Sequence, residues 1–522
     1  MKTTVDSIIY NAKVYTVNTS FEIQESFAIT NGKFVAIGTN ESILEKYTAS
    51  NTINLKGKTV FPGFIDPHCH FYGLGLTLQQ VNLVGTKSYE EVLERIQKFH
   101  KENPSDFIKG RGWNQNEWET KEFPTKDKLD ELFPNMPVAV NRIDGHAMLA
   151  NQKALDLAAI DANTKIDGGE IILKDGKPTG VLLDNAMNLV YKIMTKPSKK
   201  IQIKGLKEAE AVCFSYGITS VSDAELGQET VELMHDLQQR NQLKIRIYSM
   251  ILATKSSLNY YLQKGVSKTD KLTINAFKFY IDGALGSKGA YLKENYENEN
   301  HQGILVNTEE RLLEIAQKIK DSQFQLNVHA IGDQANEIAL KTFVDKVGIS
   351  KERRWRVEHA QIIDPIDFKY FEIIFPSAQP THATSDMYWA EKILGKKRMK
   401  GAYAYKELLN RNGRIALGTD FPIEQVNPFL TFYSAVARKD TKGFPANGFQ
   451  IENALTREET IKGMTIWAAY SNFEENEKGS IQKGKFADFI VLDQDIMTCE
   501  IDEVPNTKVL MTFSGGELVF GE

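Results

Sequence analysis

The middle of the chain alternates short apolar runs with stretches in which apolar residues recur at helical spacing. The apolar runs predict eight strands, at residues 60–68, 217–224, 245–252, 274–282, 324–330, 354–360, 372–379 and 414–420. Between most of these runs lie helix-compatible segments such as TEERLLEIAQKIKDS. Strands joined by helical crossovers are what an α/β protein with a (β/α)8 TIM-like barrel requires, and a doubly wound open sheet is the alternative.

The two ends of the chain differ from the middle, because they read as short alternating strands with tight turns. A hairpin signal stands at Asn31-Gly32, and a second turn stands at Gly515-Gly516. Chain termini usually lie close together at the surface. We therefore expect residues 1–60 and 481–522 to form one small composite β-sandwich domain beside a barrel of residues 61–480. Two unrelated strand clusters are the alternative.

The spacing of strands breaks once, after the first strand of the barrel. Residues 77–200 form a long insertion that contains GRGWNQNEW, PVAVNRIDGHAML and EIILKDGKPTGVLLD. These segments mix helical and strand patterns, so we expect an α/β insertion that covers the mouth of the barrel.

Composition narrows the class of partner. The 522 residues carry a formal net charge of -5 without a basic run, which gives no electrostatic case for nucleic acid. A membrane span needs about 20 apolar residues, and the sequence has no such run and no pattern of a signal peptide at its start. The three cysteines are odd in number and far apart, which indicates a reducing compartment. We expect a cytoplasmic protein whose partners are small molecules or copies of itself, with no membrane partner.

Two histidines, His68 and His70, end the first predicted strand. Side chains two apart on a strand share a face, so both imidazoles can approach one metal ion, whereas Cys69 between them faces the other way and is predicted to be a packed thiol.

Further candidate donors follow at later strands of the predicted barrel, where active sites of this fold are built: Lys278, His329, His359 and Asp420. Singly, each histidine could be a satisfied core residue and Asp420 a turn former. Together the set predicts a metal centre, because imidazole and carboxylate groups are zinc ligands.

Lys278 needs a separate argument, since an ammonium group has no lone pair for a metal. It lies between Phe277 and Phe279 in an apolar strand, where its charged form would be costly and its pKa depressed. The free amine could add carbon dioxide and give a carbamate, a carboxylate able to bridge two cations. A snorkelling or salt-bridged lysine is the alternative.

An ordered series of motifs along nearly the whole chain resembles the amidohydrolase superfamily. The likeness is to the amidohydrolase-3 branch, which includes the YtcJ-like proteins and the N-substituted formamide deformylases. It rests on NGKFVAIG, FPGFIDPHCHF, GITSVSDAE, FKFYIDGALGSKGA, NVHAIGD, RVEHAQ, QPTHATSD, LGTDFPIEQVNPF and GSIQKGKFADFIVLD. The resemblance implies a (β/α)8 barrel with a β-sandwich built from both termini.

The resemblance also implies a binuclear zinc centre and assigns its ligands. His68, His70 and Asp420 would hold one Zn2+ ion, His329 and His359 the other, and carboxylated Lys278 would bridge them. Members of the superfamily use either one or two ions, and related proteins are often homodimers.

The expected reaction is hydrolysis of a non-peptide carbon–nitrogen bond, in an amide, N-formyl or N-acyl compound, by a metal-activated hydroxide. Asp420 would carry the proton, and His382 could donate to the oxyanion, although a structural or surface role is an alternative. His146 in the insertion is a candidate substrate contact, as is Asp282, which could orient Lys278 or a substrate group. A mononuclear deaminase that leaves Lys278 unmodified is the second hypothesis, and a non-catalytic barrel scaffold is the third.

Overall fold

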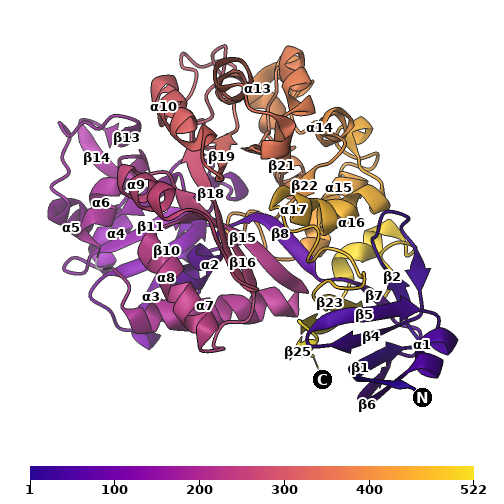
Figure 1. Ribbon diagram of the computed structural model, residues 1–522. Coiled ribbons are helices and arrows are strands. Elements are labelled where there is room, and N and C mark those ends of the chain that lie inside the picture. Colours follow the sequence, from indigo (N-terminus) through magenta and orange to yellow (C-terminus); the bar gives the residue numbers. More distant parts are fainter. Residues whose placement is uncertain (195, 522) are drawn as a thin grey trace.

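Eight parallel strands curve into a nearly closed barrel at the centre of the molecule (Figure 1). In this computed structural model, which describes residues 1–194 and 196–521, their order is β22-β21-β20-β19-β18-β16-β15-β8. The barrel strands are β8 (Phe64–Cys69), β15 (Ile218–Leu226), β16 (Arg246–Leu252), β18 (Leu272–Tyr280), β19 (Gln325–Ala330), β20 (Arg356–His359), β21 (Phe375–Ala378) and β22 (Ala416–Leu417). The short strand β17 (Ser267–Lys268) pairs with β18 from outside this path. Each strand lies within or overlaps one of the eight predicted runs. The prediction of a (β/α)8 barrel is therefore confirmed, in preference to the alternative of a doubly wound open sheet.

Backbone contacts join the first barrel strand to the last. The Asp420 N–H donates to the His68 carbonyl at 2.9 Å, and the His70 N–H donates to the Phe421 carbonyl at 2.8 Å. The same two bonds therefore bring the histidines that end β8 to the carboxylate that follows β22.

Helices pack around the barrel and follow the predicted spacing. They are α2 (Phe71–Thr77), α7 (Lys199–Ser215), α8 (Gln228–Gln239), α9 (Lys255–Lys264), α10 (Glu309–Lys320), α11 (Asp333–Lys341), α12 (Pro380–Asp386), α13 (Ala390–Met399), α14 (Tyr405–Asn412), α15 (Pro428–Ala437), α16 (Arg457–Gly463) and α17 (Ile466–Ser471). In α10, Thr308 caps the first turn by accepting from the Arg311 N–H, and the buried face consists of Leu312, Ile315, Ala316 and Ile319. Within the described residues, every helix is too short or too polar to cross a bilayer.

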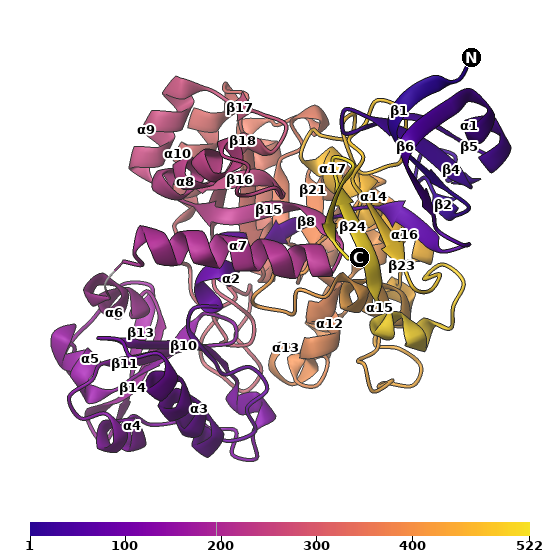
Figure 2. The ribbon, with the colours of Figure 1, turned by 90° about the horizontal axis from the view of Figure 1, so that it is seen from below.

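Strands from both ends of the chain share one sheet beside the barrel (Figure 2). Its order is β25-β24-β23-β7-β2-β3, with β2 (Lys13–Tyr15), β3 (Ile23–Gln24), β7 (Thr59–Pro62), β23 (Phe489–Leu492), β24 (Val509–Ser514) and β25 (Glu517–Phe520). A second sheet, β5-β4-β1-β6, consists of β1 (Thr3–Tyr10), β4 (Ser26–Thr30), β5 (Lys33–Gly38) and β6 (Tyr47–Asn54), with α1 (Asn40–Lys46) between the last two. Phe27 and Phe34 of this sheet pack in one core with Phe489 and Phe513 of the other.

The predicted single strand at residues 60–68 is in fact two strands in two sheets. β7 pairs with β23 in the terminal sheet, and β8 pairs with β15 in the barrel. Gly63 lies between them, where a Cβ atom would collide with the Thr219 side chain. The continuous run of apolar residues hides this break, because both strands are buried on both faces.

The insertion after β8 forms a mixed α/β unit with its own sheet, of order β13-β14-β12-β11-β10-β9. Its elements are β9 (Val81–Asn82), α3 (Tyr89–Glu102), β10 (Ile108–Trp113), α4 (Asp127–Leu132), β11 (Val138–Arg142), β12 (Ala147–Ala150), α5 (Gln152–Leu157), β13 (Gly169–Lys174), β14 (Lys177–Asp184) and α6 (Met187–Ile193). The helices on either side of the insertion, α2 and α7, cross at Gly75 and Gly205, where a Cβ on either residue would meet the backbone of the other. This close crossing holds both ends of the insertion against the barrel (Figure 2).

Candidate metal centre

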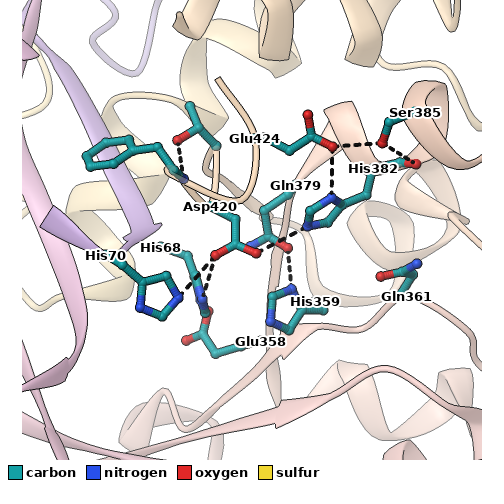
Figure 3. Close-up of polar contacts among 12 residues, drawn as sticks. His68, His70, Glu358, His359, Gln361, Gln379, His382, Ser385, Asp420 and Glu424 are labelled. Carbon is teal, nitrogen blue, oxygen red and sulfur yellow. Dashed lines mark hydrogen bonds and ion pairs between the residues drawn. The ribbon is translucent and has the colours of Figure 1, made fainter. Parts of the chain in front are cut away.

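The six residues that the sequence singles out as metal ligands converge at the carboxyl ends of the barrel strands. His68 and Lys278 are fully buried, and His329, His359 and Asp420 are each at most 5% exposed. The His359 ring is central, because its centroid lies 4.8 Å from that of His68 and 4.5 Å from that of His329. Figure 3 shows the rings of His68, His70 and His359 around the Asp420 carboxylate.

Asp420 lies between the two histidines of the first strand. Its Oδ1 atom is 3.3 Å from His70 Nε2 and 3.6 Å from His68 Nε2. His70 lies one residue beyond the end of β8 and precedes α2, so its approach to Asp420 does not depend on strand alternation. Cys69 is buried in the apolar core, as the sequence predicts.

The most compact group of donors differs from the pairing that the family resemblance implies. Ligand atoms of His68, His359 and Asp420 lie within 4.8 Å of one another. The resemblance instead assigns His359 to a second ion with His329. Because the His359 ring lies close to both His68 and His329, it is near the residues assigned to the first ion as well as those assigned to the second.

Outer hydrogen bonds fix the orientation of two rings. His68 Nδ1 lies 2.5 Å from Glu358 Oε2, and His359 Nδ1 lies 2.8 Å from Gln379 Oε1. The Nδ1 atom of each ring is thus bonded to an outer residue, which leaves Nε2 as the ligand atom, the arrangement found around metal-bound histidines. Burial opposes ionisation of Glu358, but Arg356 and His68 outweigh it and hold the pKa of Glu358 well below its usual range.

Buried ligand atoms that lack a hydrogen bond show that this site fits a cation. Among the described residues, His329 Nε2 and Asp420 Oδ1 are buried and lack a hydrogen bond, which is costly for polar atoms. Burial holds the pKa values of His329 and His359 well below the usual range, so both rings are neutral and carry a lone pair. Neutral imidazoles beside a carboxylate are the donor set that zinc prefers.

Lys278 lies in the same cluster with its side chain fully enclosed. Its Nζ atom is 3.4 Å from His68 Nε2 and 4.6 Å from the centroid of the Tyr280 ring. No ion pair to Lys278 occurs in the part of the chain that the structure describes. Burial lowers the pKa of Lys278, as its apolar sequence context predicts.

Two backbone positions at the centre are strained. His359 has a φ of 74° and Asp420 a φ of 63°, in the left-handed region of backbone angles that residues other than glycine rarely adopt. Such strain collects at functional sites, where the surrounding structure holds a side chain in one direction. Here it turns His359 out of the strand alternation, so that His359 and the adjacent Glu358 both serve the same centre.

His382 borders Asp420 on the side away from the first strand (Figure 3). Its Nε2 atom is 3.3 Å from Asp420 Oδ2, and its Nδ1 atom is 3.3 Å from Glu424 Oε1. Burial lowers the pKa of His382, but the two carboxylates outweigh burial and raise it to about 10. The ring is therefore a charged donor at neutral pH.

The insertion contributes His146 to the edge of the centre. The His146 ring lies 6.4 Å from the His329 ring, and its Nδ1 atom is held 2.6 Å from Asp184 Oδ1. This places a residue of the insertion beside the histidines of the barrel.

Asp282 is fully buried and acts on the backbone around His329. It accepts hydrogen bonds from the N–H groups of Tyr291, Ile331 and Gly332 at 2.8 to 3.0 Å, and its Oδ1 atom lies 3.6 Å from His329 Nε2. The described contacts of Asp282 thus fix the loops after β18 and β19 rather than Lys278.

Sequence reasoning missed three polar residues that support the centre: Glu358, Gln379 and Glu424. A carboxylate inside the predicted strand RWRVEHA was a signal for Glu358, since a buried charge requires a partner. Gln379 and Glu424 lie beside candidate histidines only in space, so no local pattern distinguishes them.

A barrel with imidazole, carboxylate and lysine side chains converging at its strand ends defines a class, the metal-dependent hydrolases of this fold. The comparisons with known proteins agree. A model of the amidohydrolase family matches residues 51–520. YtcJ of Bacillus subtilis (strain 168), described as an amidohydrolase, is 31% identical over 525 residues, which are 98% of this chain and 99% of YtcJ.

Two further relatives support the same class. The N-substituted formamide deformylase of Arthrobacter pascens is 24% identical over 98% of each chain. An uncharacterized metal-dependent hydrolase from Pyrococcus horikoshii OT3 has a TM-score of 0.78 and 26% identity, over 95% of this chain and 99% of that chain. The chain belongs to the amidohydrolase family, and it is a hydrolase that acts on carbon–nitrogen bonds other than peptide bonds.

Proposed function

We propose that the protein hydrolyses an amide, N-formyl or N-acyl compound with divalent metal, zinc, held at the barrel mouth. The observation that carries the proposal is the set of buried ligand atoms without a hydrogen bond among the described residues, His329 Nε2 and Asp420 Oδ1, beside rings whose Nδ1 atoms are already bonded. A bound metal of this kind supplies a Lewis acid and lowers the pKa of a bound water toward about 7.

His68, His70 and Asp420 would hold one ion, and His329 and His359 a second. Carboxylated Lys278 would bridge them. The enclosed Lys278 amine, without an ion pair among the described residues, supports this modification, in which the amine nitrogen bonds to carbon dioxide and releases one proton.

Asp420 is the proposed proton carrier. Its Oδ1 atom points to the histidines of β8, and its Oδ2 atom is close to His382. A carboxylate so placed can take a proton from the attacking water and deliver it to the leaving nitrogen.

His382, a charged donor on the rim of the centre, is proposed to stabilise the negative oxygen that forms on the substrate carbonyl. His146 is proposed to contact the substrate from the insertion. For Asp282, the three backbone bonds support a positioning role for His329, and a direct substrate contact stays a prediction.

The N-substituted formamide deformylase among the relatives supports an N-formyl group as the first substrate to test. The three cysteines are free thiols, which supports a reducing, cytoplasmic location.

A mononuclear aminohydrolase is the second candidate, and one observation favours it. The compact group of His68, His359 and Asp420 could hold a single ion without any modification of Lys278. The third hypothesis, a non-catalytic scaffold, is opposed by the retention of all six candidate ligands.

Metal content and lysine chemistry distinguish these candidates. We expect about two zinc ions per chain by plasma emission, together with a peptide containing Lys278 that is heavier by one carbon dioxide when analysed under native conditions. One tightly bound ion and an unmodified lysine would instead establish the mononuclear enzyme. The zinc-loaded protein should hydrolyse members of an N-formyl, N-acyl, cyclic amide and lactone series, and the Asp420→Asn variant should not.

A further inference from the structure

Arg111, in the GRGW segment of the insertion, is a partly buried cation without an ion-pair partner. Its Nη2 atom donates to the Ile143 carbonyl at 2.6 Å, and its Nε atom is buried without a hydrogen bond. Over residues 1–194 and 196–521, no carboxylate lies within ion-pair distance of this guanidinium. A buried charge of this kind is costly unless another group neutralises it.

The neighbouring arginine on the adjacent strand differs from Arg111 in having a full set of partners. Arg142 lies on the adjacent strand β11, and all three of its nitrogens are bonded. Nη1 pairs with Asp144 at 2.5 Å, while Nε and Nη2 donate to the side-chain oxygens of Gln115 and Asn114. Asp144, the carboxylate of the turn at residues 143–146, is thus already paired with Arg142.

Arg111 lies against the turn that carries His146. The guanidinium is bonded to the Ile143 carbonyl, and its Nη1 atom would lie 3.2 Å from a Cβ at Gly145, so a side chain at that position would crowd it. The next residue, His146, lies 6.4 Å from the His329 ring. Burial lowers the pKa of Arg111, whereas Tyr191, Asp144 and Asp420 act in the opposite direction, so a carboxylate of the centre contributes to the electrostatic environment of the guanidinium.

A row of side chains connects Arg111 with open solvent. Asn141 is the register partner of Arg111 on β11, and its Nδ2 atom donates to Tyr191 Oη at 2.7 Å. Tyr191 in turn lines an open hollow of about 520 Å³ together with Asp167, Asn185 and Asn188.

We propose that Arg111 is an anion subsite that binds a carboxylate on the substrate while the bond to be cleaved lies at the metal centre. The inference rests on the proposed hydrolase function and narrows its substrates to N-acyl or N-formyl compounds with an acidic group, such as N-acylated amino acids. A guanidinium binds a carboxylate through paired, charge-assisted hydrogen bonds, which a neutral carboxamide cannot match.

The test compares N-formylglycine with N-formylglycinamide, which differ in charge but have nearly the same shape. The wild-type enzyme should prefer the carboxylate in kcat/KM. In Arg111→Gln this preference should fall by about 10- to 100-fold, the usual effect of losing a charge-assisted bond, and Arg111→Lys should retain part of it. Arg95→Gln is the control, because Arg95 also bonds loop carbonyls of the insertion but has its own partner, Glu91.

Two kinetic results would overturn the proposal. One is a wild-type enzyme that does not discriminate between the two compounds. The other is an Arg111→Gln variant that loses activity equally toward both, since that is the effect of a residue that only supports the His146 turn.

Calorimetric titration of succinate separates this inference from the proposed reaction. Succinate should bind the wild type and the Arg95→Gln control alike, and at least about tenfold more weakly to Arg111→Gln. Binding that depends on Arg111 without hydrolysis of any compound would refute the proposed function and uphold the subsite. Equal binding to the wild type and to Arg111→Gln would refute the subsite.

Discussion

Replacing Glu358 with glutamine should weaken both the barrel and its metal centre. The Glu358 carboxylate is fully enclosed, 2.7 Å from Arg356 Nε and 2.5 Å from His68 Nδ1. Glutamine keeps the shape and one acceptor oxygen but removes the charge, and leaves the Arg356 guanidinium uncompensated. Breaking a buried ion pair in this way costs about 3 to 5 kcal/mol of stability.

The second effect of Glu358→Gln acts through His68. Loss of an outer partner of a metal-bound histidine lowers metal affinity by about 10- to 100-fold, which is about 1.4 to 2.8 kcal/mol. Thermal unfolding of the metal-free protein measures the first effect, and competition with a chromophoric chelator measures the second. The two effects are thus separable in one variant.

Asp488→Asn provides the matched control. Asp488 also forms a buried pair, with Arg246 Nε at 2.7 Å and Nη2 at 3.0 Å, but this pair joins the barrel to the terminal sheet. It should lower the unfolding temperature as Glu358→Gln does and leave metal affinity unchanged. If both variants lost metal affinity equally, or neither did, the assignment of Glu358 as the residue that orients His68 would be refuted.

Three further predictions address the metal, the proton carrier and a lysine far from the centre. Removing the metal with a chelator should abolish hydrolysis, and added zinc should restore it; activity that survives complete metal removal would contradict the proposed chemistry. Asp420→Asn should lower kcat by about 100- to 10,000-fold with an unchanged circular dichroism spectrum, and a small loss would exclude Asp420 as the proton carrier. Burial lowers the pKa of Lys485 from 10.5 to about 8, so the unfolded chain binds more protons between these pH values and stability should rise as pH increases from about 8 to 10.5. Thermal unfolding across this range should show that rise in the wild type and not in Lys485→Met, and identical profiles would contradict it.

The strands of the barrel could be predicted because a parallel strand that is buried on both faces appears in the sequence as a continuous apolar run. Where one buried strand passes directly into another, as at Gly63, the pattern cannot locate the break, since β7 and β8 are equally apolar. The order of strands in the insertion also lies outside local pattern, because register depends on partners far along the chain.

The candidate ligands were found because histidine and aspartate at strand ends are unusual residues in a regular place. The residues that bond to these ligands were not found, because they become neighbours of the ligands only in three dimensions. Glu358 lies 290 positions from His68. The role proposed for Arg111 depends on its bond to the Ile143 carbonyl and on the lack of a carboxylate within ion-pair distance among the described residues.

The shared terminal sheet has a consequence for the order of events during synthesis. β7 precedes the first metal ligand, yet its antiparallel partner β23 ends at Leu492. One edge of β7 can pair with β2 early, but a ribosome must translate past residue 492 before the other edge can pair with β23, and until then that edge is free to associate with other nascent chains. Chaperone dependence in the cell should arise at this sheet, while the metal centre, assembled from strands between β8 and β22, can be complete earlier.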